Sequence, residues 1–283
     1  MKIMSVVGAR PNFMKVAPII TAINEHNVSC ATDQPIEHIL VHTGQHYDRL
    51  MSDSFFADLG LPDPDVHLGV GSGSHAAQTA EIMKKFEEVL IRERPDVLVV
   101  VGDVNSTVAC ALVASKISLN TSGARPVIAH VEAGLRSFDR TMPEELNRIV
   151  TDHLSDLLFV TEQSGMRNLK REGITMEKVH FVGNTMIDSL LACSEKASSS
   201  SILDKLSLRR CDGPSVEIKR YVLLTLHRAA NVDHRDVLLS IFNGLEPLAP
   251  QYQIVFPAHP RTRKRITDFG LSRLFDWTYT TRD

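Results

Sequence analysis

The stretch VIAHVEAGLRSFDRTMPEELNR, residues 127–148, joins an apolar, β-branched run to an amphipathic helical pattern. Glu132 stands where the predicted strand ends, and Arg136, Glu144, Glu145 and Arg148 follow it. Charged side chains at the carboxyl end of a parallel strand face the crevice in which α/β proteins bind ligands. This stretch therefore predicts an α/β fold with a ligand site at its strand ends.

Apolar runs alternate with helical patterns on both sides of this stretch. Such alternation is typical of a parallel sheet covered by helices on both faces. We therefore expect a complete Rossmann-like, doubly wound domain over residues 1–185. Its strands are expected at 2–8, 38–44, 96–102, 126–132, 156–161 and 179–183, and its helices at 12–25, 73–93, 105–117, 142–155 and 162–172.

A second domain is expected over residues 186–283. A helix is expected to start within 184–193, and the serine-rich segment 194–219 that follows suggests a linker or exposed loop. Strands are expected at 220–226 and 252–257, with a helix at 234–247 and another after Pro260. Two strands bury too little apolar surface to be stable alone, so we expect a second Rossmann-like domain that is incomplete.

Composition excludes several classes of protein. The net charge of −3 argues against a nucleic-acid surface or a basic membrane-binding face. No apolar stretch is long enough to span a bilayer, and the N-terminus lacks a signal-peptide pattern. Scattered cysteines with no CxxC spacing suggest reduced residues in a cytoplasmic protein without a metal framework. These cysteines are Cys30, Cys110, Cys193 and Cys211.

Two carboxylates follow predicted strands in the first domain. Asp103 lies in GDVNST, residues 102–107, where its structural alternative is a role at the helix start. Glu132 has no evident capping role, and its structural alternative is an ion pair with Arg136. Gly134 allows close backbone approach next to Glu132. Carboxylates at two strand ends suggest acid/base chemistry on a small molecule.

Glu144 supports two interpretations. Thr141 and Glu144 fit a capping box, with Pro143 in the first turn of the helix. In that case Glu144 is structural. A carboxylate at a helix N-terminus is also held rigidly and kept ionised by the helix dipole, which suits a charge-stabilising role.

Basic residues follow other predicted strands. Arg10, in GARPNFMK at residues 8–15, precedes a helix N-terminus and suits an anion. This segment matches neither a GxGxxG nor a Walker A pattern, so we expect neither NAD nor an ATP site. His227, Arg228 and His259 follow the strands of the second domain and suggest an anion site there, with solvated surface residues as the alternative.

The ordered motifs together resemble one family, the non-hydrolysing UDP-N-acetylglucosamine 2-epimerases. The resemblance covers residues 1 to about 270. It rests on GARPNFMK (8–15), TGQHYD (43–48), GDVNST (102–107), HVEAGLRS (130–137), MPEELNR (142–148), GNT (183–185) with Asp188, LHR (226–228) and PAHPRT (257–262).

The resemblance implies two Rossmann-like domains in a glycosyltransferase-B arrangement, acting without metal or other cofactor. It implies interconversion of UDP-GlcNAc and UDP-ManNAc by elimination and re-addition of UDP through a 2-acetamidoglucal intermediate, and a homodimer when the chain is full length. Asp103, Glu132, Glu144 and His227 would be catalytic. Arg10, Arg136, Arg228 and His259 would bind the nucleotide sugar.

The sequence also departs from the family pattern. Ala230 replaces a usual glutamate, and Asp48 puts activation by UDP-GlcNAc in doubt. The family's Ser-Gly-Gly loop and C-terminal helix are absent, so we expect a C-terminally truncated chain with little or no activity. Two alternatives stay open, a hydrolysing relative that releases UDP and ManNAc and a non-catalytic fragment. HVEAGLR argues against the first, and the missing UDP-binding segment supports the second.

Overall fold

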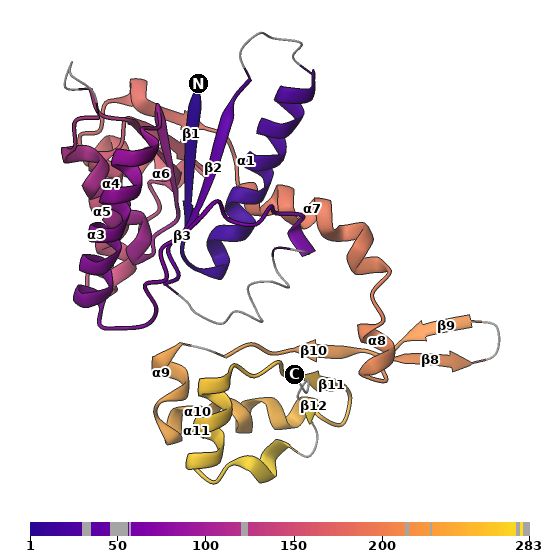
Figure 1. Cartoon of the computed structure of the whole chain (residues 1–283). Coiled ribbons are helices and arrows are strands. Elements are labelled where there is room, and N and C mark those ends of the chain that lie inside the picture. Colours follow the sequence, from indigo (N-terminus) through magenta and orange to yellow (C-terminus); the bar gives the residue numbers. More distant parts are fainter. Residues whose placement is uncertain are drawn as a thin grey trace. The chain divides into compact units, whose positions relative to one another are not determined.

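The computed structural model describes residues 1–29, 35–45, 56, 58–119, 124–212, 215–226, 228–275 and 278–279. The chain divides into two compact units, Met1–Glu195 and Lys196–Asp283 (Figure 1). The division falls later than residue 185 because the helix that begins at Thr185 packs on unit 1. There the Ser189 hydroxyl donates to the Met14 carbonyl at 2.6 Å.

Unit 1 is built on a seven-stranded sheet in the order β3-β2-β1-β4-β5-β6-β7. All of its strand pairs are parallel. The chain winds outward in opposite directions from β1 and β4, so the topological switch point lies between these two strands. Six expected strands are confirmed, and β3 was missed because two residues show no period. The strands are β1 (Lys2–Val7), β2 (Glu37–His42), β3 (Val66–His67), β4 (Val97–Val101), β5 (Val127–Ala133), β6 (Leu157–Val160) and β7 (Val179–Phe181).

Helices cover both faces of this sheet (Figure 1). On one face α1 packs on Val7 and Leu40, and α7 lies beside α1. On the other face α3 and α4 pack on Leu98 and Val100, with α5 and α6 beside them. The helices are α1 (Arg10–Ser29), α3 (His75–Glu93), α4 (Asn105–Lys116), α5 (Pro143–Leu154), α6 (Gln163–Arg171), the 3-10 helix η1 (Met176–Lys178) and α7 (Thr185–Ser198).

Unit 2 contains a three-stranded parallel sheet in the order β10-β11-β12. Its core gathers Val232, Leu238, Phe242 and Phe256. The expectation of only two strands was wrong, because β12 is a pair of residues too short to show a period. The elements are β10 (Tyr221–Leu223), α9 (Ala229–Val232), α10 (Arg235–Leu245), η2 (Glu246–Leu248), β11 (Gln253–Val255), α11 (Pro260–Asp268), η3 (Ser272–Phe275) and β12 (Thr278–Tyr279).

The expected linker over 194–219 was also wrong in large part. It holds the end of α7, the short helix α8 (Ile202–Lys205) and an antiparallel hairpin of β8 (Arg209–Asp212) and β9 (Ser215–Ile218). Leu206 and Leu208 are buried against Val255. Leu203, Leu206 and Leu208 stand among serines and charged residues, so their spacing shows no clear helical or strand period. Their packing nevertheless anchors the segment to unit 2.

Candidate functional site

The turn between β4 and α4 places Asp103 at the carboxyl edge of the unit 1 sheet. Gly102 takes φ +68°, which glycine adopts without strain. The Val101 carbonyl accepts from the Asn12 amide at 3.0 Å and from the Thr107 hydroxyl at 2.9 Å. The Asp103 carbonyl accepts from the Asn147 amide at 2.9 Å. Side chains of α1, α4 and α5 therefore fix the backbone on both sides of Gly102.

Arg148 joins the Asp103 side chain to a second carboxylate. Its Nη2 lies 2.9 Å from Asp103 Oδ2, and its Nη1 lies 2.6 Å from Glu145 Oε2. The Asp103 side chain stays 29% exposed, whereas that of Glu145 is 1% exposed. Asp103 thus presents a fixed carboxylate to solvent from a partly buried network.

Glu145 holds the loop that precedes α5. Its carboxylate accepts from the Ser137 amide at 2.9 Å, the Ser137 hydroxyl at 3.0 Å and the Phe138 amide at 2.9 Å. Burial opposes ionisation of Glu145, but these hydrogen bonds and the Arg148 charge outweigh burial, so its pKa lies below its ordinary value. Glu145 is an organising residue that the sequence analysis did not single out.

The expected capping box does not form. The Thr141 hydroxyl donates to Asp139 Oδ1 at 2.6 Å, and Met142 occupies the N-cap of α5 without a side-chain bond. Glu144 therefore has no capping partner, because Asp139 holds the threonine that would have paired with it. Among the residues that the structure describes, the Glu144 carboxylate has no hydrogen-bond or ion-pair partner.

Asp103 and Glu144 line one cavity of about 260 Å³. The other polar side chains on its wall include the amides of Gln45, Asn105 and Asn147. Gln45 is fixed because its Oε1 accepts from the Ser106 amide at 3.0 Å and from the Ser106 hydroxyl at 2.7 Å. The wall combines two carboxylates with oriented amides, which suits a polar ligand such as a sugar.

Glu132 lies on a β-bulge at the end of β5. The register with β6 shifts between Val131 and Ala133, and Glu132 takes φ +74°. Because one residue is inserted, Val131 packs toward α1, whereas Ala133 packs with Leu158 on the other face. A non-glycine residue at positive φ costs roughly 1–3 kcal/mol and typically marks a functional site.

The partner of Glu132 is Lys15 rather than Arg136. Lys15 comes from α1, and its side chain is 8% exposed. A methyl group added to Gly102 would lie 2.8 Å from Lys15 Nζ and 3.4 Å from Glu132 Oε2. Glu132 therefore sits behind the Asp103 turn, next to the cavity but not on its wall. Lys15 was not among the predicted site residues, although it belongs to the GARPNFMK segment.

Arg136 has an internal role that leaves no surface for a substrate. Its side chain is 1% exposed, and its Nη2 lies 2.8 Å from Asp152 Oδ2 and 2.6 Å from Glu172 Oε2. The interpretation of Arg136 as a substrate contact is therefore not carried further. The paired residues come from α5 and the end of α6, and no local pattern connected them to Arg136.

None of the remaining predicted residues is among the described residues that line the cavity. Arg10 is half-buried at the start of α1, directly after the β1 strand end. Arg228 is an exposed N-cap of α9. His259 is the exposed N-cap of α11, where its Nδ1 accepts from the Arg261 amide at 3.3 Å. His227 and Asp48 lie outside the described residues.

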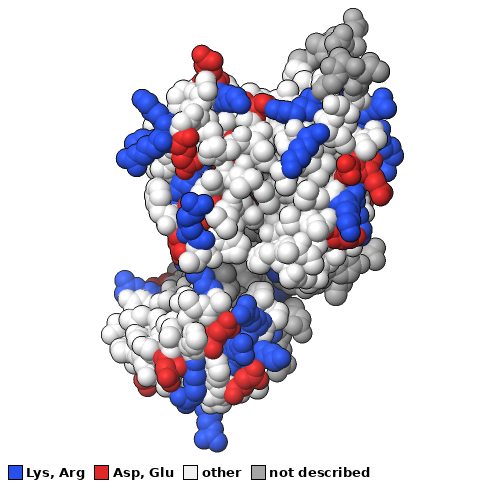
Figure 2. Space-filling model, turned by 90° about the vertical axis from the view of Figure 1, so that its left-hand side faces the viewer, with Lys and Arg blue, Asp and Glu red and all other residues white. Residues whose placement is uncertain are grey.

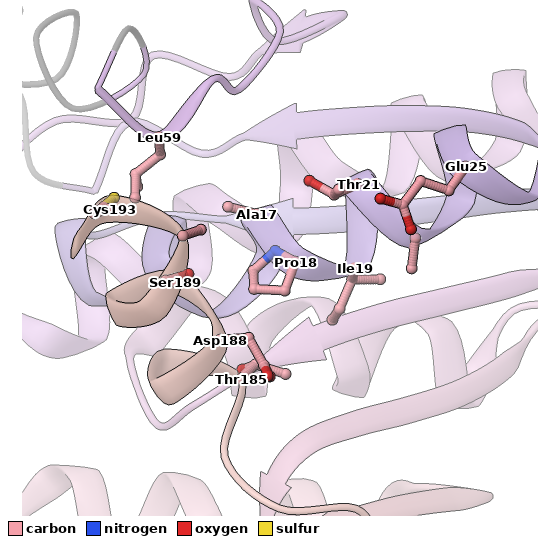
Figure 3. Close-up of a pocket in the computed structure, with 12 residues that line it drawn as sticks. Ala17, Pro18, Ile19, Thr21, Glu25, Leu59, Thr185, Asp188, Ser189 and Cys193 are labelled. Atoms are coloured by element: carbon pink, nitrogen blue, oxygen red, sulfur yellow. The ribbon is translucent and has the colours of Figure 1, made fainter. Parts of the chain in front are cut away.

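A larger cavity of about 580 Å³ lies between α1 and α7 (Figure 3). Ala17, Pro18 and Ile19 of α1 face Asp188 and Ser189 of α7 across it. A hydrogen bond from the Ser189 hydroxyl to the Met14 carbonyl ties the two helices together. The larger cavity also has two carboxylates on its wall, Glu25 and Asp188, but its described lining holds no amide side chain. Because the smaller cavity combines carboxylates with oriented amides, we take the smaller cavity as the candidate site.

Comparison with known proteins decides the family. The family model for UDP-N-acetylglucosamine 2-epimerase matches residues 28–277. The chain belongs to this family. It is 43% identical over 274 residues to the UDP-N-acetylglucosamine 2-epimerase of Methanocaldococcus jannaschii, covering 96% of this chain and 69% of that protein. A Methanococcus maripaludis homologue of the enzyme is 44% identical over 271 residues, with coverage of 96% and 69%.

Solved structures and one further relative extend this result. The M. jannaschii epimerase in complex with UDP-GlcNAc and UDP matches with a TM-score of 0.83 and 39% identity, over 100% of this chain and 73% of that one. The family fold is thus shared along the whole chain. The UDP-2,3-diacetamido-2,3-dideoxy-D-glucuronate 2-epimerase of Pseudomonas aeruginosa is 41% identical, with coverage of 96% and 70%.

Proposed function

We propose that this chain holds the proton-transfer site of an enzyme that interconverts UDP-GlcNAc and UDP-ManNAc; the little or no activity expected above for the chain by itself is one outcome of the same test. The observation that carries the proposal is the pair of carboxylates, Asp103 and Glu144, on one wall of a polar cavity at the carboxyl edge of the sheet. Glu132 lies next to Gly102, the residue before Asp103. The epimerase family membership supplies the reaction class, and these residues supply groups able to perform it.

The proposed reaction inverts C2 of the sugar in two steps. A carboxylate takes the proton from C2 while the bond from C1 to the diphosphate oxygen breaks, and its electron pair leaves with UDP. The remaining 2-acetamidoglucal then accepts a proton at C2 from the opposite face, and UDP adds back to C1. Oxidation states are the same before and after, so the reaction needs no redox cofactor.

The carboxylates of unit 1 suit the demands of this reaction. The C2 proton is weakly acidic, so positive charge must develop at C1 as UDP leaves. Asp103 and Glu144 would stabilise that charge and, with Glu132, transfer protons. The Arg148 and Lys15 cations hold Asp103 and Glu132 in place rather than facing the cavity.

The departing diphosphate needs cations. We propose that Arg10, His227, Arg228 and His259 contact it, with Arg10 at the β1 strand end and the others after strands of unit 2. For His227 the support is the sequence resemblance alone. Arg136 is omitted because its guanidinium is occupied inside unit 1.

The predicted partners form part of the same proposal. We expect a nucleotide-sugar substrate, a homodimer in the full-length protein and a cytoplasmic location. On the face shown in Figure 2, lysine and arginine side chains are interspersed with acidic ones, which does not favour nucleic-acid binding. Within the described ranges, no helix has the length and apolarity needed to cross a membrane. In the same residues no three metal-ligating side chains are grouped together.

Product analysis in D2O tests the proposal. The chain is incubated with UDP-GlcNAc, with the M. jannaschii epimerase as positive control, and products are followed by proton NMR. UDP-ManNAc with deuterium at C2 would support the proposal. Free ManNAc and UDP would show a hydrolysing enzyme, and unchanged UDP-GlcNAc beside an active control would refute turnover by this chain. UDP-2,3-diacetamido-2,3-dideoxy-D-glucuronate is tested in parallel because one relative carries that name.

Glu132→Gln connects the activity to the site. Loss of a general acid or base lowers turnover by at least about 100-fold. The matched control is Glu162→Gln, which removes an exposed carboxylate from the N-cap of α6. Turnover close to wild type in Glu132→Gln would reject a proton-transfer role for this residue.

A further inference from the structure

His130 is a fully buried histidine whose two ring nitrogens both face acceptors. Its Nδ1 lies 2.7 Å from Asp152 Oδ1, and its Nε2 lies 2.8 Å from the Gly102 carbonyl oxygen. A carbonyl oxygen can only accept, so Nε2 must carry a hydrogen. If Asp152 is ionised, Nδ1 must carry one as well.

The surroundings keep Asp152 ionised. Besides His130, its carboxylate accepts from the Gly134 amide at 3.1 Å and lies 2.8 Å from Arg136 Nη2. Both of these donors favour the ionised carboxylate, because hydrogen bonds and positive charge at a carboxylate stabilise its charged form. Arg136 also pairs with Glu172. Two carboxylates then share one guanidinium. Glu172 is 27% exposed to solvent, whereas Asp152 is fully buried, so a positive charge on His130 would offset the buried charge of Asp152.

The Nε2 hydrogen of His130 acts on the turn that carries Asp103. The carbonyls on either side of Gly102 are bound by neutral amides and a hydroxyl, from Asn12, Thr107 and Asn147. The Gly102 carbonyl is the one bound by the histidine. A charged donor forms a shorter and stronger hydrogen bond than a neutral one. His130 therefore fixes the peptide immediately before Asp103 from inside the sheet.

We propose that His130 is a positioning residue for the reaction, held as an imidazolium by Asp152 and fixing Asp103 through the Gly102 carbonyl. This inference rests on the proposed function for its effect on turnover. The protonation of His130 and the rigidity of the turn are independent of that function, and they are measured separately.

The charge on His130 is measured first, by NMR of the whole chain with 15N-labelled histidine. His130 is expected to show a hydrogen on each ring nitrogen at neutral pH. His42 is the internal control: it is 3% exposed, its Nδ1 accepts from the Gly44 amide at 3.0 Å, and burial with the neighbouring His67 lowers its pKa to about 4. It should show a hydrogen on Nε2 only. A single ring N–H signal from His130 would overturn the proposal.

Two variants separate the two bonds of His130. His130→Gln places an amide donor toward the Gly102 carbonyl. His130→Asn places an amide donor toward Asp152 and leaves the Gly102 carbonyl without the bond from residue 130. Exchange of the Gly102 amide, which donates to the Val131 carbonyl, should accelerate at least about tenfold in His130→Asn and much less in His130→Gln. Equal exchange in the two variants would refute a role at the turn.

Turnover of UDP-GlcNAc completes the test. In His130→Asn, kcat should fall between about 10-fold and 100-fold with KM nearly unchanged, because a small displacement at a reacting centre is costly. His130→Gln should recover much of that loss. An unchanged kcat in His130→Asn would contradict the positioning role. If the wild type converts no UDP-GlcNAc while both ring hydrogens are seen, the proposed function fails and the charged His130 stands.

Asp152→Asn covers the case in which the His130 variants do not fold. The asparagine keeps the size of the side chain and removes its charge. His130 should then lose one of its two ring N–H signals, since neither the carboxylate nor the charge balance supports an imidazolium. Retention of both signals in Asp152→Asn would overturn the assignment.

Discussion

The strand ends of the two units differ in how firmly their side chains are held. In unit 1, Asp103 is held by Arg148, whose side chain is 14% exposed, and the paired Glu145 is buried. In unit 2, Arg261 pairs with Asp233 after the β11 strand end, and the Arg261 side chain is 52% exposed. Asp103 thus meets a mostly buried arginine in unit 1, whereas in unit 2 Asp233 meets two arginines, Arg261 and Arg265, that are 52% and 38% exposed.

The difference follows from the size of the two sheets and the number of helices that pack around their strand ends. Asp103 follows a central strand of seven, so α1, α4 and α5 all reach its turn. His259 follows a strand of a three-stranded sheet, and its ring accepts a hydrogen bond from its own helix, at the Arg261 amide. A position at a strand end therefore indicates where a ligand binds. The number of elements packed around that strand end determines how rigidly its side chains are held.

The largest expected effect is on stability, and it compares the two arginines. Arg148→Gln leaves the buried Glu145 without its cation and should destabilise unit 1 by about 3 kcal/mol. Arg261→Gln should have a far smaller effect, because water and salt weaken exposed pairs. Urea unfolding is monitored by hydrogen exchange of backbone amides, with those of β4 reporting on unit 1 and those of β10 reporting on unit 2. Equal losses from the two variants would break the comparison.

Two glycines of unit 1 separate the cost of a left-handed backbone from the cost of close packing. Gly134 and Gly173 share φ +80°, but a Cβ at Gly134 would lie 2.6 Å from the Gly165 carbonyl oxygen, whereas one at Gly173 meets nothing within 4 Å. Gly173→Ala should cost about 1–2 kcal/mol from backbone conformation alone. Gly134→Ala should cost about 1 kcal/mol or more beyond that, since backbone blocks the added methyl group. Identical unfolding midpoints would show that the close approach is unimportant.

His42 predicts a pH dependence specific to unit 1. Burial lowers its pKa from 6.5 to about 4, so between these values the unfolded chain binds more protons than the folded chain. Above pH 6.5 His42 is neutral in both states and no stability is lost. As pH falls below 6.5 the folded state loses stability, and the loss reaches about 3 kcal/mol once pH is below the folded-state pKa. His42→Gln should flatten unfolding free energy against pH over this range. The exposed His234→Gln, in unit 2, should leave the profile unchanged.

Much of the fold was predictable because long apolar strands and helices carry clear periods. The six longest strands of unit 1 and its helices were expected, whereas β3 and β12 are too short to have a period. The β-bulge at Glu132 also gave no signal, because one inserted residue leaves the local composition unchanged. Sequence alone therefore located the strand ends but not their detailed geometry.

The candidate site was predictable in part for the same reason. Asp103 and Glu144 were expected from their positions, and the structure places both on one cavity. Lys15 and Asp152 were missed, because their partners lie far away in the chain and meet them only through the sheet order. The capping box was wrong because the helix begins one residue later, with Met142 as N-cap, and the Thr141 amide that Glu144 would bind donates to Asp139 instead.

Exchange of the sugar C2 hydrogen tests most directly whether the unit 1 strand ends perform the proton chemistry. The chain and its Asp103→Asn and Arg261→Gln variants are incubated with saturating UDP-GlcNAc in D2O, and deuterium at C2 is followed by NMR. We predict that Asp103→Asn slows exchange by at least about 100-fold and that Arg261→Gln stays near wild type. Wild-type exchange in Asp103→Asn, or an equal loss in Arg261→Gln, would contradict the account.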